Sequence, residues 1–190
     1  MCKAKLASLA FFYFDRDDNK KDLRSLLSSL IFQLYDQSDS YFDILSAFHS
    51  AHRCGSQYPG DTALAQCLKD MLSSPGQAPI YVIIDGIDKC PKSSNNFPPR
   101  EDVLTFVEEL VDLHLPTLHI CVSSRPEVDI TAVISPLALH SISLHSEAAQ
   151  KEEIVKYVRS IVGSKPGMRN WAVEDKELVI DLLLQKADGT

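Results

Sequence analysis

Two periods of apolar residues alternate along the first three quarters of the chain. Apolar residues three and four positions apart predict helices over 22–34, 41–52, 61–72, 101–113 and 127–134. Short apolar runs rich in β-branched and aromatic residues predict strands over 7–14, 80–84 and 118–123, and alternation of polar and apolar residues predicts another over 140–144. Strands that alternate with helices predict an α/β fold in which helices cover both faces of a parallel sheet, making three layers.

The pattern changes after residue 145. Two amphipathic helices are predicted there, the first around 154–162 and the second over 174–186, where Leu178, Leu182 and Leu183 provide the apolar positions. No strand pattern follows them. The sequence therefore predicts an α/β core over residues 1–145 and the start of a helical subdomain over residues 146–190.

The strand predicted over Ile80–Ile84 leads into two aspartates, Asp85 and Asp88. In open α/β sheets, ligands bind at the carboxyl ends of the strands. A carboxylate at position 85 suits a hydrated Mg²⁺ on a nucleotide phosphate, and Asp88 would orient or deprotonate an attacking water. An alternative is that Asp85-Gly86 only turns the chain at the end of a strand. Both interpretations stay open on this stretch alone.

The strand predicted over 118–123 also ends in polar residues. Ser123 and Ser124 supply hydroxyl groups, and Arg125 supplies a guanidinium before Pro126. The two serines are either phosphate ligands or turn residues, because no nucleophile motif surrounds them. Arg125 is either a contact to a phosphate or the residue at which the next helix begins.

Composition narrows the classes of partner and compartment. The 190 residues carry a net charge of −7, which argues against a nucleic-acid surface or an anionic membrane as partner. No apolar run has membrane length, and the first residues lack a secretory signal, so we expect a cytoplasmic protein. The five cysteines form no Cys-x-x-Cys pair and are expected to be reduced and mostly buried.

The order of these motifs resembles that of the NACHT-type NTPases. The motifs are Asp85-Gly86-Ile87-Asp88, then Ser124-Arg125-Pro126, then Lys186-Ala187-Asp188-Gly189. The chain looks most like the fungal proteins that carry a NACHT or nephrocystin-type N-terminal domain. The resemblance implies a P-loop fold of the signal-transduction class that binds ATP or GTP with Mg²⁺ and switches oligomeric state.

The same resemblance implies roles for individual residues. Asp85 would be the Mg²⁺ carboxylate of the Walker B strand, and Asp88 would be the water-orienting acid and a second metal ligand. Ser124 and Arg125 would bind the nucleotide, with Arg125 as the sensor of the terminal phosphate. Lys89 stands where the family usually has an acidic residue, so the resemblance does not extend to hydrolysis.

The phosphate-binding loop Gly-x-x-x-x-Gly-Lys-Ser/Thr appears nowhere in the sequence. We therefore expect a partial P-loop core that lacks its first strand and is not active by itself. The expected partners are a nucleotide, the rest of a multidomain chain and other copies of this chain. The alternative is a scaffold that acts through protein contacts without nucleotide.

Overall fold

A computed structural model describes residues 6–15, 22–52, 58–92, 99–143, 148–168 and 171–187. Its contacts divide the chain into two units, Met1–Ala138 and Leu139–Thr190. The first unit contains a three-stranded parallel sheet in the order β1-β2-β3. The strands are β1 (Ser8–Tyr13), β2 (Ile80–Asp85) and β3 (Leu118–Val122). The predicted α/β class and parallel sheet are confirmed.

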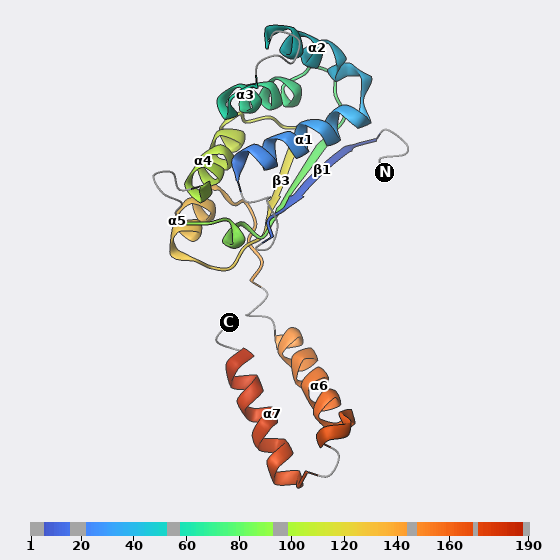
Figure 1. The fold of residues 1–190 in the computed structure, drawn as a ribbon, viewed down its shortest axis with the longest axis vertical. Helices are drawn as coiled ribbons and strands as arrows, with labels where there is room; N and C mark the ends of the chain where they lie inside the picture. Colours follow the sequence, from blue (N-terminus) through green and yellow to red (C-terminus); the bar gives the residue numbers. More distant parts are fainter. Residues whose placement is uncertain are drawn as a thin grey trace. The chain divides into compact units, whose positions relative to one another are not determined.

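Five helices of the first unit correspond to the five that the apolar spacing predicts. They are α1 (Leu23–Gln37), α2 (Phe42–Ala51), α3 (Asp61–Leu72), α4 (Pro99–Asp112) and α5 (Val128–Leu137), with short 3₁₀ turns η2 (Asp39–Tyr41) and η4 (Ile87–Lys89) (Figure 1). Asp22 caps α1, because its Oδ1 accepts a hydrogen bond of 2.9 Å from the Ser25 N–H.

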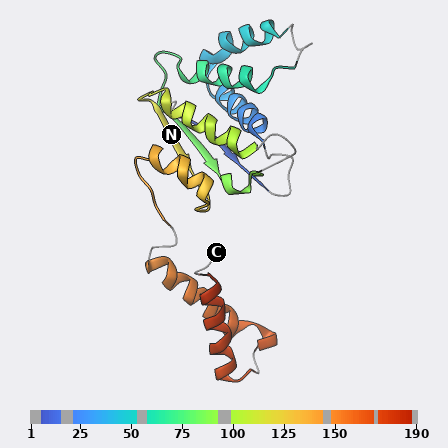
Figure 2. The same ribbon diagram turned by 90° about the vertical axis from the view of Figure 1, so that its left-hand side faces the viewer.

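One face of the sheet forms the core with the helices. Its buried residues are Ala10, Phe12, Ile80, Val82 and Ile84. Helix α1 packs against β1 and α3, and α4 packs against α1 and α5. Figures 1 and 2 both show α4 and α5 lying side by side.

The other face of the sheet is not covered by any described element of the first unit. Phe11 and Tyr13 are 50% and 51% exposed, and Tyr81 and Ile83 are 43% and 38% exposed. The prediction that helices cover both faces of the central strand is therefore wrong for this unit. The strand order β1-β2-β3 follows the sequence, so both crossover connections move across the sheet in the same direction. Crossover connections that share one direction and one handedness place their helices on the same face of the sheet.

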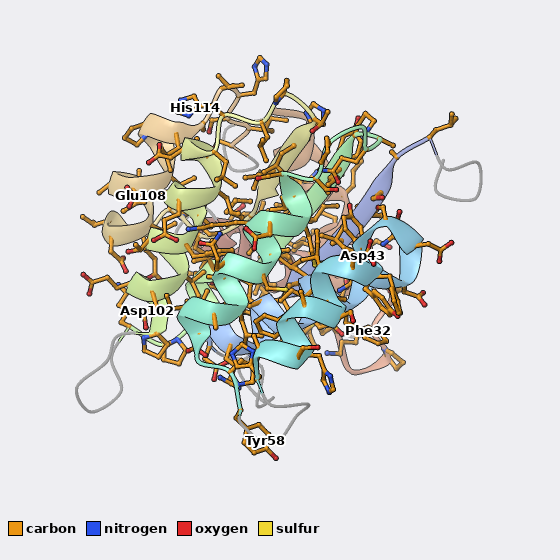
Figure 3. The ribbon with its side chains drawn as sticks, turned by 90° about the horizontal axis from the view of Figure 1, so that it is seen from above. Phe32, Asp43, Tyr58, Asp102, Glu108 and His114 are labelled. Carbon is orange, nitrogen blue, oxygen red and sulfur yellow. The ribbon has the colours of Figure 1, made fainter. Side chains whose placement is uncertain are left out.

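The helices are amphipathic in the way that their sequences predict. Figure 3 shows Asp102 and Glu108 on the outer side of α4, whereas Val103 and Val107 of the same helix are buried. Tyr58, before α3, is 91% exposed and also projects outward in Figure 3. The core therefore lies between the helices and one face of the sheet.

The strand predicted over His140–Leu144 is not present at residues 140–143, and Leu144 lies outside the described residues. The segment alternates polar and apolar residues, but Ile142 is 78% exposed. A strand requires a neighbour that accepts and donates its backbone hydrogen bonds. No described strand pairs with this segment, so its alternation does not become a strand.

The second unit is a pair of helices. Helix α6 (Ala148–Ser164) and helix α7 (Val173–Ala187) contact each other and are joined through the 3₁₀ turn η6 (Pro166–Met168). Val162 and Ile180 are buried, whereas Leu178, Leu182 and Leu183 are 60%, 50% and 45% exposed. Both predicted helices are confirmed. Over the described residues, no helix has the length and apolar character that a membrane span requires.

Candidate functional site

The register of β2 and β3 brings Asp85 and Ser123 together. Ile84 is level with Val122, so the next residue of each strand lies at the same edge of the sheet. The Ser123 hydroxyl donates a hydrogen bond to Asp85 Oδ1, and the Ser123 N–H donates to the Ile84 carbonyl oxygen at 2.9 Å. Asp85 is exposed. A carboxylate held by a hydroxyl is thus presented to solvent where the two strands end.

Gly86 turns the chain sharply after Asp85. Its φ of +73° lies in the left-handed region, which favours glycine. A Cβ at this position would also lie 3.4 Å from the Phe14 carbonyl oxygen. The Gly86 N–H donates to the Ser123 carbonyl oxygen at 3.0 Å. This turn leads into η4, which carries Asp88.

Asp88 and Arg125 form the second contact of the site. Asp88 Oδ1 accepts a hydrogen bond of 3.2 Å from the Arg125 N–H, and Asp88 Oδ2 lies 3.5 Å from Arg125 Nε. The Asp88 side chain is 7% exposed and that of Arg125 is 62% exposed. Arg125 therefore bonds to Asp88 with its backbone and its side chain, while most of its guanidinium faces solvent.

Ser124 does not join either pair. Its hydroxyl donates to the carbonyl oxygen of Arg125 at 2.8 Å, and the residue is exposed. Of the four residues chosen from the sequence, Asp88 and Arg125 are brought into contact. Asp85 instead contacts Ser123, so the structure places two pairs of residues at the carboxyl ends of β2 and β3.

The family comparison matches the part of the chain that carries these residues. Residues 1–125 match the family described as Nephrocystin 3, N-terminal. The chain belongs to this family. The nephrocystin 3 N-terminal match includes all of the sheet and ends at Arg125, so both pairs lie within it. Searches of curated proteins and of solved structures gave no match.

Within this nephrocystin 3 N-terminal segment, the donor atoms at Asp85 fit a hydrated Mg²⁺. Magnesium is usually held by one or two carboxylates and keeps several of its waters. Asp85 is exposed, and the hydroxyl of Ser123 contacts its Oδ1. Both oxygens of Asp88 face Arg125, which makes Asp88 less suited to contact a metal directly. Among the described residues, no group of three or more His, Cys, Asp or Glu side chains forms a metal site.

Two residues of this region have contacts that the sequence did not indicate. The sequence offers Ser123 and Ser124 alike as phosphate ligands or turn residues, but only Ser123 stands opposite Asp85 when both strands are followed to their ends. Arg100 immediately precedes the helix predicted over 101–113, yet it is 4% exposed and lies within α4. An arginine at the first turn of a helix gives no sequence signal that it is buried.

A cluster of charges lies beside the Asp88–Arg125 pair. Hydrogen bonds from Lys92 and Arg100 lower the pKa of Glu127. Burial alone would raise the pKa of Asp129, but hydrogen bonds from the same two cations lower it overall. Burial alone would lower the pKa of Arg100, and hydrogen bonds to both carboxylates raise it overall. All four groups are therefore charged near neutral pH.

Proposed function

We propose that this chain supplies the carboxylate and arginine side of a Mg²⁺-dependent ATP or GTP site of the NACHT type. The observation that carries the proposal is that Asp85 and Arg125 both stand at the carboxyl ends of adjacent parallel strands, each with a polar partner. Ligands bind at this edge in open α/β sheets. The proposed role is a nucleotide-dependent switch in a larger signalling protein.

Each residue has a stated task in this proposal. Asp85 would hold the metal with Ser123 fixing its carboxylate, and bound Mg²⁺ would neutralise phosphate charge. The exposed Arg125 guanidinium would contact the terminal phosphate, since arginine binds phosphate oxygens through two parallel hydrogen bonds. Asp88 would keep Arg125 in place and face the water that approaches the phosphate. Ser124 stays a predicted nucleotide contact that would require its hydroxyl to rotate.

The isolated chain should bind nucleotide weakly, because the sequence contains no Gly-x-x-x-x-Gly-Lys-Ser/Thr loop. That loop normally supplies most of the phosphate contacts through backbone amides and a lysine. We expect a Kd of about 1 mM or weaker, which corresponds to about −4 kcal/mol. An affinity in the micromolar range for the isolated chain would contradict this account of the site.

Ligand-observed NMR with Mg²⁺ and ATP or GTP at millimolar concentration tests the assignment. Binding should require Mg²⁺ and should be lost in Asp85→Asn and in Arg125→Met. Asp43→Asn and Arg24→Met are matched controls, because Asp43 lies on the exposed side of α2 and Arg24 forms a surface ion pair with Asp61 (Figure 3). Binding that is equal in Asp85→Asn and the native chain would exclude Asp85 as the metal ligand.

A scaffold that acts through contacts with other copies of the chain is the second candidate. It is favoured by the uncovered face of the sheet, on which Phe11, Tyr13, Tyr81 and Ile83 are each more than a third exposed. Monomeric proteins rarely expose contiguous apolar patches larger than a few hundred Å². Size-exclusion chromatography across a concentration series should show self-association. A monomer at every concentration, with no binding of a hydrophobic dye, would contradict the scaffold.

A further inference from the structure

Arg100 is a charged residue that is only 4% exposed. Its guanidinium remains charged at any physiological pH. Burying a charge is unfavourable unless the group is paired and fully hydrogen-bonded. The contacts of Arg100 therefore indicate what this buried charge is used for.

One side of the guanidinium holds the turn that contains Asp88. Arg100 Nε and Nη2 donate to the Cys90 carbonyl oxygen at 2.9 and 2.7 Å. Nη2 also donates to the carbonyl oxygen of Asp88. These bonds fix the backbone on either side of Lys89, at the point where η4 ends.

The other side of the guanidinium holds the segment that follows Arg125. Nη1 donates to Glu127 Oε2 at 2.6 Å and to Asp129 Oδ2 at 3.2 Å. Glu127 is the residue before α5, and Asp129 lies in its first turn. One planar group thus connects the turn after β2 with the segment between β3 and α5.

The geometry points to Arg100 as the positioning residue for the Asp88–Arg125 pair. Asp88 and Arg125 lie on the two segments that Arg100 ties together, and their own contacts are a hydrogen bond of 3.2 Å and an ion pair of 3.5 Å. Without the link, these two modest contacts and the backbone hydrogen bonds from Gly86 and Ile87 to the Ser123 carbonyl oxygen would have to hold the pair. The inference goes beyond the proposed function, because the link acts on both segments whether or not a nucleotide binds.

Lys92 provides a natural comparison with Arg100. Its Nζ lies 2.8 Å from Glu127 Oε2 and 3.3 Å from Asp129 Oδ1, so it faces the same two carboxylates. Its side chain is 60% exposed, and no hydrogen bond joins it to the carbonyl oxygen of Asp88 or of Cys90. A lysine is a point charge and lacks the rigid fork of donors that an arginine presents. If neutralising Glu127 and Asp129 were enough to position the Asp88–Arg125 pair, replacing Lys92 would have the same effect on that pair as replacing Arg100.

Amide hydrogen exchange measured by NMR on the full chain separates these possibilities. The reporters are the N–H of Cys90, bonded to the Ile87 carbonyl oxygen at 3.0 Å, and the N–H of Glu127, bonded to the Arg125 carbonyl oxygen at 2.8 Å. The N–H of Ser123, which is bonded to the Ile84 carbonyl oxygen of β2 at 2.9 Å, is the reference. Arg100→Lys should speed exchange at both reporters by about tenfold relative to Ser123, the effect of losing about one net hydrogen bond. Lys92→Met should change them by less than about threefold, as expected for an exposed ion pair.

A second variant is informative if Arg100→Lys does not fold. Glu127→Ala removes a partly exposed side chain that has no hydrogen bond to Cys90, so faster exchange at the Cys90 N–H requires transmission through Arg100. We expect this acceleration, at about threefold or more. The inference fails if Cys90 exchange is unchanged in Glu127→Ala. It also fails if Lys92→Met matches Arg100→Lys, or if Arg100→Lys accelerates Ser123 as much as the two reporters.

Discussion

The two edges of the sheet differ in how their backbone groups are satisfied. At the β1 edge, Gln37 of α1 donates to the Leu9 carbonyl oxygen at 2.7 Å and accepts from the Leu9 N–H at 2.9 Å. Gln33 bonds in the same way to Phe11, at 2.7 and 3.0 Å. Two glutamine side chains thus act as a substitute for a neighbouring strand.

The β3 edge has no such substitute among the described residues. Ser123 and the alternate residues before it bond toward β2, which leaves the N–H and C=O of Ile120 and Val122 directed outward. No described residue forms a hydrogen bond with those groups. Unpaired groups along a strand are a template for pairing with another chain. Helix α1 thus closes one edge with its own side chains, while no described residue closes the other.

The largest expected effect comes from opening the closed edge. In the double variant Gln33→Ala/Gln37→Ala, four backbone groups of β1 lose their partners. We expect the free energy of unfolding to fall by about 1.5–3 kcal/mol, because each unsatisfied group loses about 1 kcal/mol or somewhat less where water reaches it. Chemical denaturation measures this. Gln66→Ala is the matched control, since Gln66 bonds only to Asp70 one turn along α3, and an equal loss in both variants would refute the role of the edge.

The single variants should divide this effect unequally. The bonds of Gln37 with Leu9 are partly buried, whereas those of Gln33 with Phe11 are exposed to water. Water replaces a lost partner more readily at an exposed position, so we expect about 1–2 kcal/mol for Gln37→Ala and about 0.5–1 kcal/mol for Gln33→Ala. The reverse order in denaturation would show that burial does not decide the strength of these bonds.

A fall in pH should destabilise the segment that follows β3, at the open edge, before it destabilises the closed β1 edge. The lowered pKa values of Glu127 and Asp129 mean that both carboxylates stabilise the folded state above their ordinary pKa values, about 4. This stabilisation is lost as pH falls through the lower values of the folded state. Exchange at the Glu127 N–H should therefore rise below about pH 4 by more than exchange at the Leu9 N–H. Equal acceleration at both amides, after correction for intrinsic pH dependence, would contradict this expectation.

The smallest effect on stability is expected from charging the open edge. Cys121 is exposed on β3, so Cys121→Lys should change the free energy of unfolding by less than about 0.5 kcal/mol. A lysine on an edge strand opposes pairing between chains, so self-association under reducing conditions should decrease. Ser28→Lys, at an exposed position of α1, is the control for net charge. Equal self-association of Cys121→Lys and the native chain would mean that the β3 edge is not the contact.

The thiols follow the prediction of buried cysteines only in part. Burial raises the pKa of Cys67 to about 11 and that of Cys90 to about 12, whereas Cys121 is exposed. Cys121 lies in an apolar run that reads as buried in the sequence. Its side chain belongs to the uncovered face of the sheet, so the difference arises from the arrangement of the helices. Cys2 and Cys54 lie outside the described residues.

Local pattern alone determined the strands, the helices and the polar residues that end β2 and β3. The sequence was enough to choose Asp85, Asp88 and Arg125, because each follows a short apolar strand. Such a strand is recognisable from consecutive residues. The Asp22 cap of α1 is likewise local, since its partner is three residues away. Interactions within a few residues depend on backbone geometry that the sequence specifies directly.

Tertiary structure decided which surfaces and partners these elements received. Gln37 meets Leu9 across 28 positions, and Arg100 meets Glu127 across 27. An apolar run has the same pattern whether one or both faces are covered, so the exposed face of β2 could not be inferred from Ile80–Ile84. The alternation at residues 140–143 likewise pairs with no strand among the described residues. Coverage, edge closure and buried charge depend on which distant segments come together, and that is fixed only when the chain packs.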